Sequence, residues 1–345
     1  MNVPYRLRRT LRRTFLGVVV LVAFAALALL LWLLWLNRYV VYTPDGVKLD
    51  FSMSPQYAQG VIPTRPDPVE TVTIHTGEEE EEEISTELVR FSGVSVTMKQ
   101  LMNQTALVEE ALLALPKGST VCLELKNVAG YVCYTSKVAP TKDFDPAAVD
   151  ALLKKLMAEG YYLIAQIPSF QEYQFIMADQ RERVPYGLPQ KNSGTNLWLD
   201  RDFDCYWLNP ASDGTITYLI QLITELRSMG FNEVLFADFR FPRTDKIAFD
   251  GDQQEALNAA ASTLVKTCST DRFCVSFIQE TMDLQLPEGR TRLYLTGIDG
   301  TRIAETAALA TFPDPAIQLG FITTSGDTRY DQYCVLRPLE DLGGT

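Results

Sequence analysis

Residues 216–242 read ITYLIQLITELRSMGFNEVLFADFRFP. Apolar residues in the first part recur at the spacing of an amphipathic helix, and Gly230 is a residue type that commonly ends one. Residues 233–241 then form a short run rich in apolar and aromatic side chains, which predicts a strand. The stretch is therefore predicted to be a helix followed by a strand, which is the repeating unit of proteins built on parallel sheets.

The same alternation of strand and helix runs through the rest of the chain from about residue 88. Further strands are predicted over residues 89–98, 120–127, 161–170, 272–280, 292–298, 316–325 and 333–338. Further helices are predicted after the first strand through Leu112 and over residues 145–160, 253–268 and 302–312. Residues 171–210 are predicted to form a long, irregular, aromatic-rich loop.

Eight strands joined by crossovers in about 258 residues match the size of an eight-fold β/α barrel, which is about 250 residues. The alternative is a doubly wound open sheet, which usually has a glycine-rich first turn. Gly93 and Gly130 stand alone and form no such turn. We therefore predict an α/β fold, a (β/α)8 TIM-type barrel, over residues 88–345.

The N-terminal part of the chain has a different composition. Residues 1–14 form a basic tail, and residues 15–36 are an unbroken run of 22 apolar residues. At about 1.5 Å per residue this run spans roughly 33 Å, enough to cross roughly 30 Å of hydrocarbon. A cleaved signal peptide would have an apolar region of only about 7–15 residues. We predict one transmembrane anchor in the cell membrane, with the N-terminus cytoplasmic and the C-terminal domain extracellular.

Residues 37–87 are predicted to connect the anchor to the barrel. The sequence YVVYTPDGVKLDF, residues 39–51, predicts two strands with Pro44-Asp45-Gly46 at the bend. Four prolines follow, together with six consecutive glutamates over residues 78–83. Like charges at this density repel one another and stay solvated, which predicts a flexible acidic stalk.

Charge and histidine content exclude several classes of function. The chain after residue 13 holds 26 basic and 43 acidic side chains, a net charge of −17, whereas nucleic-acid binding needs a basic face. His75 is the single histidine, so neither a Ser-His-Asp triad nor a zinc site with two histidines can form. We predict no nucleic-acid partner, no metal and no cofactor. Carboxylate chemistry, sugar or peptide binding, or a structural role remains.

The six cysteines fit an extracellular domain without proving disulfides, because a large core needs no covalent staples. Cys268 and Cys274 flank the short segment STDRF and are the pair to test for a disulfide. The alternative is that all six are buried thiols, which pack as small apolar side chains.

Four stretches of the chain resemble the glycoside hydrolase-like barrels found on bacterial surfaces. The resemblance covers roughly Val94 to Cys274 and implies a TIM barrel that hydrolyses glycosidic bonds. The stretches are VCLELKNVAGYVCY (residues 121–134), LIAQIPSFQE (163–172), WLNP (207–210) followed by Tyr218 and Glu225, and MGFNEVLFADFRFP (229–242).

Active sites of such barrels lie at the C-terminal ends of the strands, where acids of this chain could cluster. Glycosidases use two carboxylates, about 5–5.5 Å apart for retention and about 6.5–9.5 Å apart for inversion. Glu124 and Asp238 are the candidate catalytic residues, as nucleophile or base and as acid. The candidate supporting residues are Lys126, Arg240, Gln166 and Glu172.

The chain departs from the family pattern at several positions. The family's acid before Arg-Phe-Pro falls on Ala237, and Asp238 takes the next position, which faces the other side of a regular strand unless a bulge intervenes. The family's second-strand aspartate is Glu124 here, and the arginine that ends its third strand is Gln166. Its late Tyr-Pro-Ser-His segment is missing. The resemblance therefore implies a divergent site.

Each candidate has a structural alternative. Glu124 and Lys126 could form a buried ion pair, Asp238 and Arg240 could pair structurally, and Glu172 and Glu280 could be solvated loop acids. Aromatic side chains over an acidic mouth suit sugar stacking, although packing under a long loop is the commoner fate of tryptophan. The candidate substrate-binding residues are Trp198, Tyr206, Trp207 and Asn209.

These observations together predict a membrane-anchored extracellular glycoside hydrolase that uses paired carboxylates. Its substrate would be a glycan, such as a cell-wall or environmental polysaccharide. The alternative is a catalytically inactive barrel that binds glycans or serves as an envelope scaffold. No feature of the sequence predicts an oligomeric state.

Overall fold

A computed structural model of the chain describes residues 40–43 and 46–49 by their backbone, and residues 88–142, 144–178, 186–193, 196–323 and 332–339 with their side chains. The chain divides into two compact units, residues 1–81 and 82–345. In the first unit, β1 (Val40–Thr43) and β2 (Gly46–Leu49) pair as the predicted antiparallel hairpin. No helix within the described ranges has the length and apolar character to cross a bilayer. The predicted anchor, residues 15–36, and the glutamate run lie outside those ranges.

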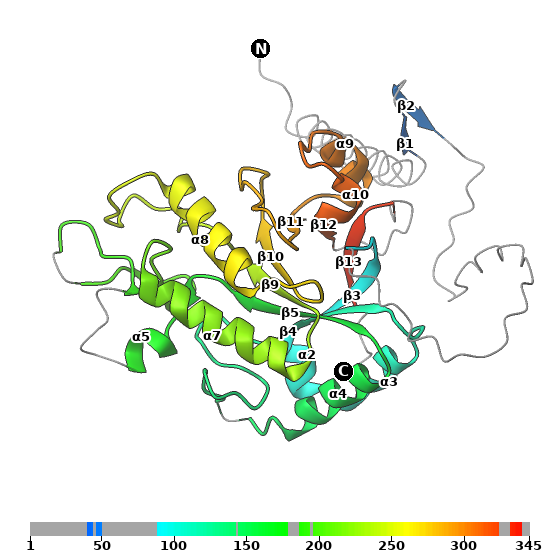
Figure 1. Cartoon of the computed structure of the whole chain (residues 1–345), viewed down its shortest axis with the longest axis horizontal. Coiled ribbons are helices and arrows are strands. Elements are labelled where there is room, and N and C mark those ends of the chain that lie inside the picture. The colour runs from blue at the N-terminus through cyan, green and yellow to red at the C-terminus, as the bar shows by residue number, and fades with distance from the viewer. Residues whose placement is uncertain are drawn as a thin grey trace, which may run out of the picture. The chain divides into compact units, whose positions relative to one another are not determined.

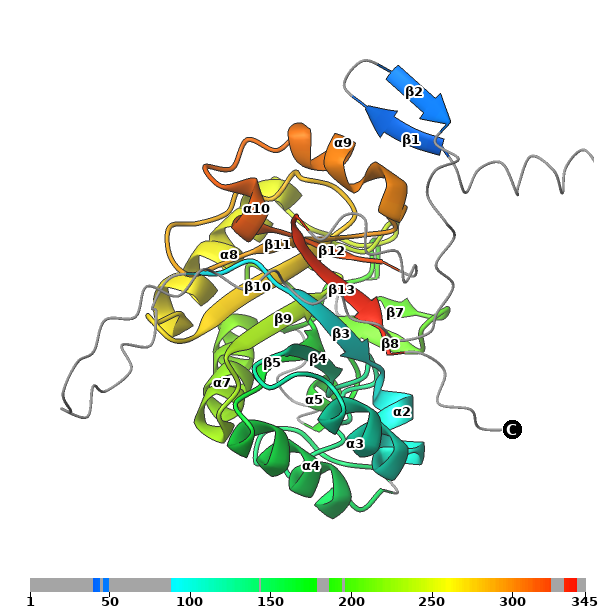
Figure 2. The same ribbon diagram turned by 90° about the vertical axis from the view of Figure 1, so that its right-hand side faces the viewer.

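Eight parallel strands close into a barrel in the second unit (Figures 1 and 2). This closed parallel barrel confirms the predicted fold class. In the order in which they pair, the strands are β3 (Ser92–Val96), β4 (Thr120–Glu124), β5 (Tyr162–Pro168), β9 (Glu233–Ala237), β10 (Cys274–Gln279), β11 (Leu293–Thr296), β12 (Leu319–Ile322) and β13 (Cys334–Pro338), with β13 pairing to β3.

Helices follow most of the strands and lie outside the barrel (Figure 2). They are α2 (Met98–Asn103), α3 (Thr105–Leu113), α4 (Ala147–Ala158), α5 (Gln174–Ala178), α7 (Asp213–Met229), α8 (Gln253–Cys268), η2 (Gly300–Arg302), α9 (Ile303–Ala308) and α10 (Pro315–Gln318). The single helix predicted after the first strand is two helices, because the chain turns at Gln104. Residues 280–292, which join β10 to β11, contain no helix.

Local sequence sets the ends of the helices near the site. Helix α7 ends at Gly230, whose φ of 106° is open to glycine and strained for other residues. Asp252 caps α8 by accepting a hydrogen bond from the Glu255 N–H. Helix α4 begins at Ala147, two residues inside the predicted range of 145–160: Pro146 holds the N-cap position, and the Asp145 carboxylate accepts from the Ala147 N–H at 3.0 Å.

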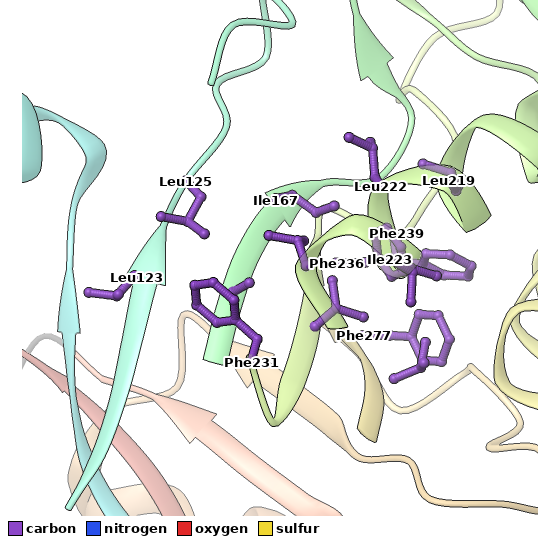
Figure 3. Close-up of a cluster of buried hydrophobic side chains, with 14 of the residues drawn as sticks. Leu123, Leu125, Ile167, Leu219, Leu222, Ile223, Phe231, Phe236, Phe239 and Phe277 are labelled. Atoms are coloured by element: carbon purple, nitrogen blue, oxygen red, sulfur yellow. The ribbon is translucent and has the colours of Figure 1, made fainter. Parts of the chain in front are cut away.

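The main core lies between the outer face of the strands and the surrounding helices (Figure 3). Leu219, Leu222 and Ile223 of α7 pack in one buried cluster with Ile167 of β5 and Phe236 of β9. These α7 residues recur every three or four positions, as the helical periodicity predicted. Burial of this stripe fixes α7 alongside the strands that carry the site.

A second, smaller cluster fills the inside of the barrel. Because successive strand residues face opposite sides, every second residue of a strand points inward. Six different strands each contribute one buried residue: Cys122, Ile164, Leu235, Ile278, Tyr294 and Leu336. The interior of the barrel is thus a packed core.

Glu233 and Arg292 form a buried ion pair inside the barrel that sequence reasoning missed. Arg292 Nη1 lies 2.5 Å from Glu233 Oε2, and the hydroxyls of Tyr162 and Tyr294 both donate to this carboxylate at 2.9 Å. Burial and the nearby Glu233 charge raise the pKa of both tyrosines well above the ordinary value. The hydroxyls therefore remain protonated donors, and the charged pair is satisfied.

All six cysteines are buried and free, which agrees with the buried-thiol alternative and gives no disulfide between Cys268 and Cys274. Burial raises the pKa of the Cys133 and Cys205 thiols to about 12. These groups are therefore neutral thiols near neutral pH, and they pack as apolar side chains.

The predicted irregular loop after β5 contains regular structure. Three short strands, β6 (Gln171–Glu172), β8 (Cys205–Trp207) and β7 (Leu199–Asp200), form an antiparallel sheet in that order. Strands of two or three residues are too short to show a repeating pattern in sequence. This sheet follows the C-terminal end of β5 and holds several of the predicted site residues.

Candidate functional site

One pocket of about 190 Å³ lies where β4, β5 and β9 end. This is the C-terminal mouth of the barrel, where the barrel geometry predicts a site. The lining residues are Glu124, Lys126, Val128, Gln166, Ile167, Pro168, Gln171, Ala237 and Asp238.

Glu124 is the last residue of β4 and is half-buried in this pocket. Its Oε2 accepts a hydrogen bond from the Met98 N–H at 2.9 Å. Met98 is the first residue of α2, so the carboxylate satisfies one of the free N–H groups at that helix start. The bond fixes the orientation of Glu124 at the mouth. The alternative of an ion pair between Glu124 and Lys126 is wrong, because Lys126 has another partner.

That partner is Glu172. Lys126 Nζ lies 2.5 Å from Glu172 Oε2, and both side chains are 1% exposed. Sequence reasoning also allowed Glu172 to be a solvated loop acid, and this reading is wrong. The small sheet carries Glu172 into the protein, where β6 pairs with β8 and buries the carboxylate.

The Glu172 carboxylate is saturated with hydrogen bonds. The Tyr218 hydroxyl donates to Oε2 at 2.9 Å, and the N–H groups of Tyr173 and Phe175 donate to Oε1 at 3.0 and 3.1 Å. Burial and the Glu172 charge raise the pKa of Tyr218 well above its ordinary value, so its hydroxyl stays a donor. A Cβ at Gly130 would lie 1.9 Å from Glu172 Oε1, which requires glycine there.

Asp238 reaches the pocket through an unusual backbone conformation. It directly follows β9 and has a φ of 50°, in the left-handed region that aspartate tolerates better than most residues. The Ser169 hydroxyl and the Arg240 N–H both donate to its carbonyl, at 2.8 and 2.7 Å. Ala237 keeps the inward strand position, and the left-handed residue after it lines the same pocket. The family's acid would fall on Ala237, and the left-handed backbone at Asp238 brings the next residue into the same pocket without a β-bulge.

Arg240 connects Asp238 to the core. Its Nε lies 3.5 Å from Asp238 Oδ1, and its guanidinium lies over the Trp207 ring, 5.2 Å from the centroid. Trp207 is 1% exposed, and its Nε1 donates to Asp200 Oδ2 at 3.0 Å. Trp207 was predicted to contact sugar, but it is a buried residue of β8 in the small sheet, and its ring contacts the arginine.

The remaining predicted binding residues do not line the pocket. Trp198 and Tyr206 are half-buried against the core and do not line the pocket. The Tyr206 ring stacks on the Tyr173 ring, with 5.8 Å between the ring centroids. Asn209 Oδ1 accepts from the Ala211 N–H at 3.0 Å, which shapes the turn before α7. The aromatic content of this loop therefore serves packing first.

Gln166 and Gln171 supply the amide groups of the pocket. Gln166 lies beside Glu124 in the strand register, and its Oε1 accepts a weak hydrogen bond from the Cys122 thiol at 3.6 Å. Gln171 was missed by sequence reasoning. It precedes Glu172 on β6, and its place in the pocket depends on the small sheet, for which the sequence gives no periodic signal.

The structure thus brings together Glu124, Lys126, Gln166 and Asp238, with Arg240 in contact with Asp238 and Glu172 behind Lys126. The aromatic candidates Trp198, Tyr206 and Trp207 are not among the residues that line the pocket. Two carboxylic acids, Glu124 and Asp238, therefore line one mouth of the barrel, and paired carboxyl groups are the residue types that acid–base chemistry uses.

Many solved structures are similar to this chain, among them the three that follow. A hypothetical protein from Ruminiclostridium thermocellum is 20% identical, with 54% of this chain and 96% of that chain covered and a TM-score of 0.44. A family 36 α-galactosidase from Geobacillus stearothermophilus is 10% identical, with 75% and 40% covered and a TM-score of 0.47. A family 20 exo-β-N-acetylglucosaminidase from Vibrio harveyi is 9% identical, with 68% and 41% covered and a TM-score of 0.45. The aligned part spans less than half of each of these two enzymes.

No curated protein sequence matches the chain. A family model described as "Putative glycosyl hydrolase domain" matches residues 93–277, which is more than half of the chain. The match begins within β3 and ends within β10, so it includes every residue that lines the pocket. This agrees with the resemblance over Val94 to Cys274, and the chain belongs to this glycosyl hydrolase domain family.

Proposed function

We propose that the barrel hydrolyses glycosidic bonds of a glycan, with Glu124 and Asp238 as the paired carboxylates. The observation that carries this proposal is that both side chains line one pocket at the C-terminal mouth of the barrel. Membership of the glycosyl hydrolase domain family supports the reaction class. Among the lining residues, these two are the only carboxylic acids in the described pocket.

The surroundings of the two carboxylates support different roles. Glu124 is half-buried, and one of its oxygens is held by the Met98 N–H, which suits a nucleophile or base that must keep a fixed position. The Asp238 side chain is 42% exposed, so it lies on the solvent side of the pocket, where a leaving group can depart. Asp238 is therefore the general acid for the leaving group. Arg240 positions Asp238 through their ion pair. Lys126 lines the pocket and is kept in place by its ion pair with Glu172.

The test is turnover of nitrophenyl glycosides by the purified full-length protein. The set contains both anomers of glucose, galactose, mannose and N-acetylglucosamine, and release of nitrophenol is followed by absorbance. We expect hydrolysis of at least one glycoside, with a rate proportional to protein concentration. Binding of a glycoside without release of nitrophenol would contradict hydrolysis and favour the inactive glycan-binding barrel.

We also propose that residues 15–36 anchor the protein in the cell membrane and that the barrel faces outward. The run of 22 apolar residues and the arginines before it support this placement. The full-length protein is expected to remain in the membrane pellet after carbonate extraction. The double variant Ala25→Arg/Leu29→Arg is expected to leave it, because each arginine at the helix centre costs about 2.5–3.5 kcal/mol of insertion free energy. Extraction of the unaltered protein would contradict the anchor.

A further inference from the structure

Gln171 has a buried side-chain amide whose nitrogen and oxygen are both without a hydrogen bond in the described part of the chain. Its side chain is 2% exposed, and among the residues that the structure describes neither Nε2 nor Oε1 has a hydrogen-bond partner. Most buried polar atoms are hydrogen-bonded, because an unpaired donor or acceptor loses its water without compensation. An apolar residue would pack at this position without that penalty. The amide therefore calls for a role other than folding.

The position of Gln171 gives it access to a ligand. Its backbone is fixed, because β6 pairs with β8 and the neighbouring Phe170 carbonyl accepts from the Leu208 N–H at 2.7 Å. Gln171 is one of the residues that line the pocket of Glu124 and Asp238. The amide is thus held on a rigid support beside the two carboxylates, as a binding group requires.

The chemistry of the amide selects the ligand class. Nε2 donates and Oε1 accepts, so a satisfying ligand must offer both an acceptor and a donor. A carboxylate or phosphate could only accept, and the charges of Glu124 and Asp238 would repel it. An ammonium group could only donate. Two neighbouring hydroxyls of a sugar ring satisfy both amide atoms, because each hydroxyl can donate or accept.

We infer that Gln171 is a substrate-binding residue that pairs with two vicinal hydroxyls of a neutral hexopyranose ring seated between Glu124 and Asp238. This inference rests on the proposed function, because it takes the pocket as the place where the sugar next to the broken bond sits. It names the substrate class as an uncharged hexoside, as opposed to an acidic or amino sugar.

The test measures binding separately from turnover. Methyl glycosides of glucose, galactose, mannose, glucuronic acid and N-acetylglucosamine are titrated into the full-length protein by calorimetry. We expect a neutral hexoside to bind most tightly and Gln171→Leu to weaken it by about 10-fold. The melting temperature of Gln171→Leu without sugar should not fall, because the substitution removes no hydrogen bond within the protein. Gln221→Leu, on the exposed side of α7, is the matched control and should leave affinity unchanged.

Deoxy analogues of the bound hexoside identify the paired hydroxyls. For the analogue that lacks a hydroxyl contacted by Gln171, the effect of Gln171→Leu should shrink, since the two changes remove the same interaction. Unchanged affinity in Gln171→Leu would overturn the inference, as would preference for glucuronic acid or failure of every neutral hexoside to bind. Binding that depends on Gln171 without any turnover would leave the inference standing and refute the proposed hydrolysis.

Discussion

Replacing Glu124 with glutamine is expected to lower kcat/KM for a nitrophenyl glycoside by about 10³-fold, within the range that a positioned acid or base contributes. The amide keeps an oxygen that can accept from the Met98 N–H, so the start of α2 and the pocket wall stay in place. What is lost is the negative charge and the basicity of the carboxylate. Steady-state kinetics on the full-length protein, with circular dichroism to confirm folding, measure the effect.

Glu280→Gln is the matched control for this substitution. Glu280 follows β10 and pairs with Arg243 on the surface, and it does not belong to the pocket lining. Its loss should leave kcat/KM within about twofold of the unaltered protein, since exposed ion pairs contribute little to stability. If Glu124→Gln retained the activity of Glu280→Gln, then Glu124 would not take part in the reaction.

Asp238→Asn separates the two proposed roles. A general acid is needed when the leaving group is a poor one, and it is dispensable when the leaving group departs without a proton. The kcat/KM of Asp238→Asn should therefore fall on a methyl or other alkyl glycoside and stay close to that of the unaltered protein on a dinitrophenyl glycoside. Glu124→Gln should be impaired on both. The opposite pattern would exchange the roles of the two carboxylates.

The regular elements of the barrel could be predicted because their patterns are local. The apolar spacing of α7, the glycine at its end and the run of β9 are all contained within residues 216–242. Parallel strands joined by helices leave few arrangements, so predicting the elements largely predicted the barrel. The carboxyl ends of β4 and β9 then place Glu124 and Asp238 at the same mouth.

The site details could not be predicted because they depend on contacts between distant residues. Glu172 is buried by Tyr218, which lies 46 residues later, and by a sheet whose strands have two or three residues. Asp238 reaches the pocket through a positive φ, and aspartate adopts that conformation too rarely for sequence to predict it. Trp207 resembled a sugar platform in sequence, whereas the fold buries it beneath Arg240.

Breaking the buried ion pair of Lys126 and Glu172 is expected to have a large effect on stability. Lys126→Met leaves the Glu172 carboxylate buried at 1% exposure without its positive partner, and breaking such a pair costs about 3–5 kcal/mol of unfolding free energy. Adding Glu172→Gln removes the uncompensated charge, so the double variant should be more stable than Lys126→Met alone. Urea denaturation of the full-length protein, followed by tryptophan fluorescence, measures both values.

Lys155→Met shows how much of this effect comes from burial. Lys155 pairs with Glu109 on the surface, and its side chain is 52% exposed. Such a pair is worth about 0.2–1 kcal/mol, because water already solvates both charges. If Lys126→Met lowered the unfolding free energy no more than Lys155→Met, solvent would have to reach the Glu172 carboxylate. The pocket lining next to Glu124 would then be accessible to water. A large decrease in unfolding free energy that Glu172→Gln partly restores would instead mean that solvent does not reach this ion pair. The pair would then keep Lys126 in place in the pocket lining, beside Gln171 and Glu124.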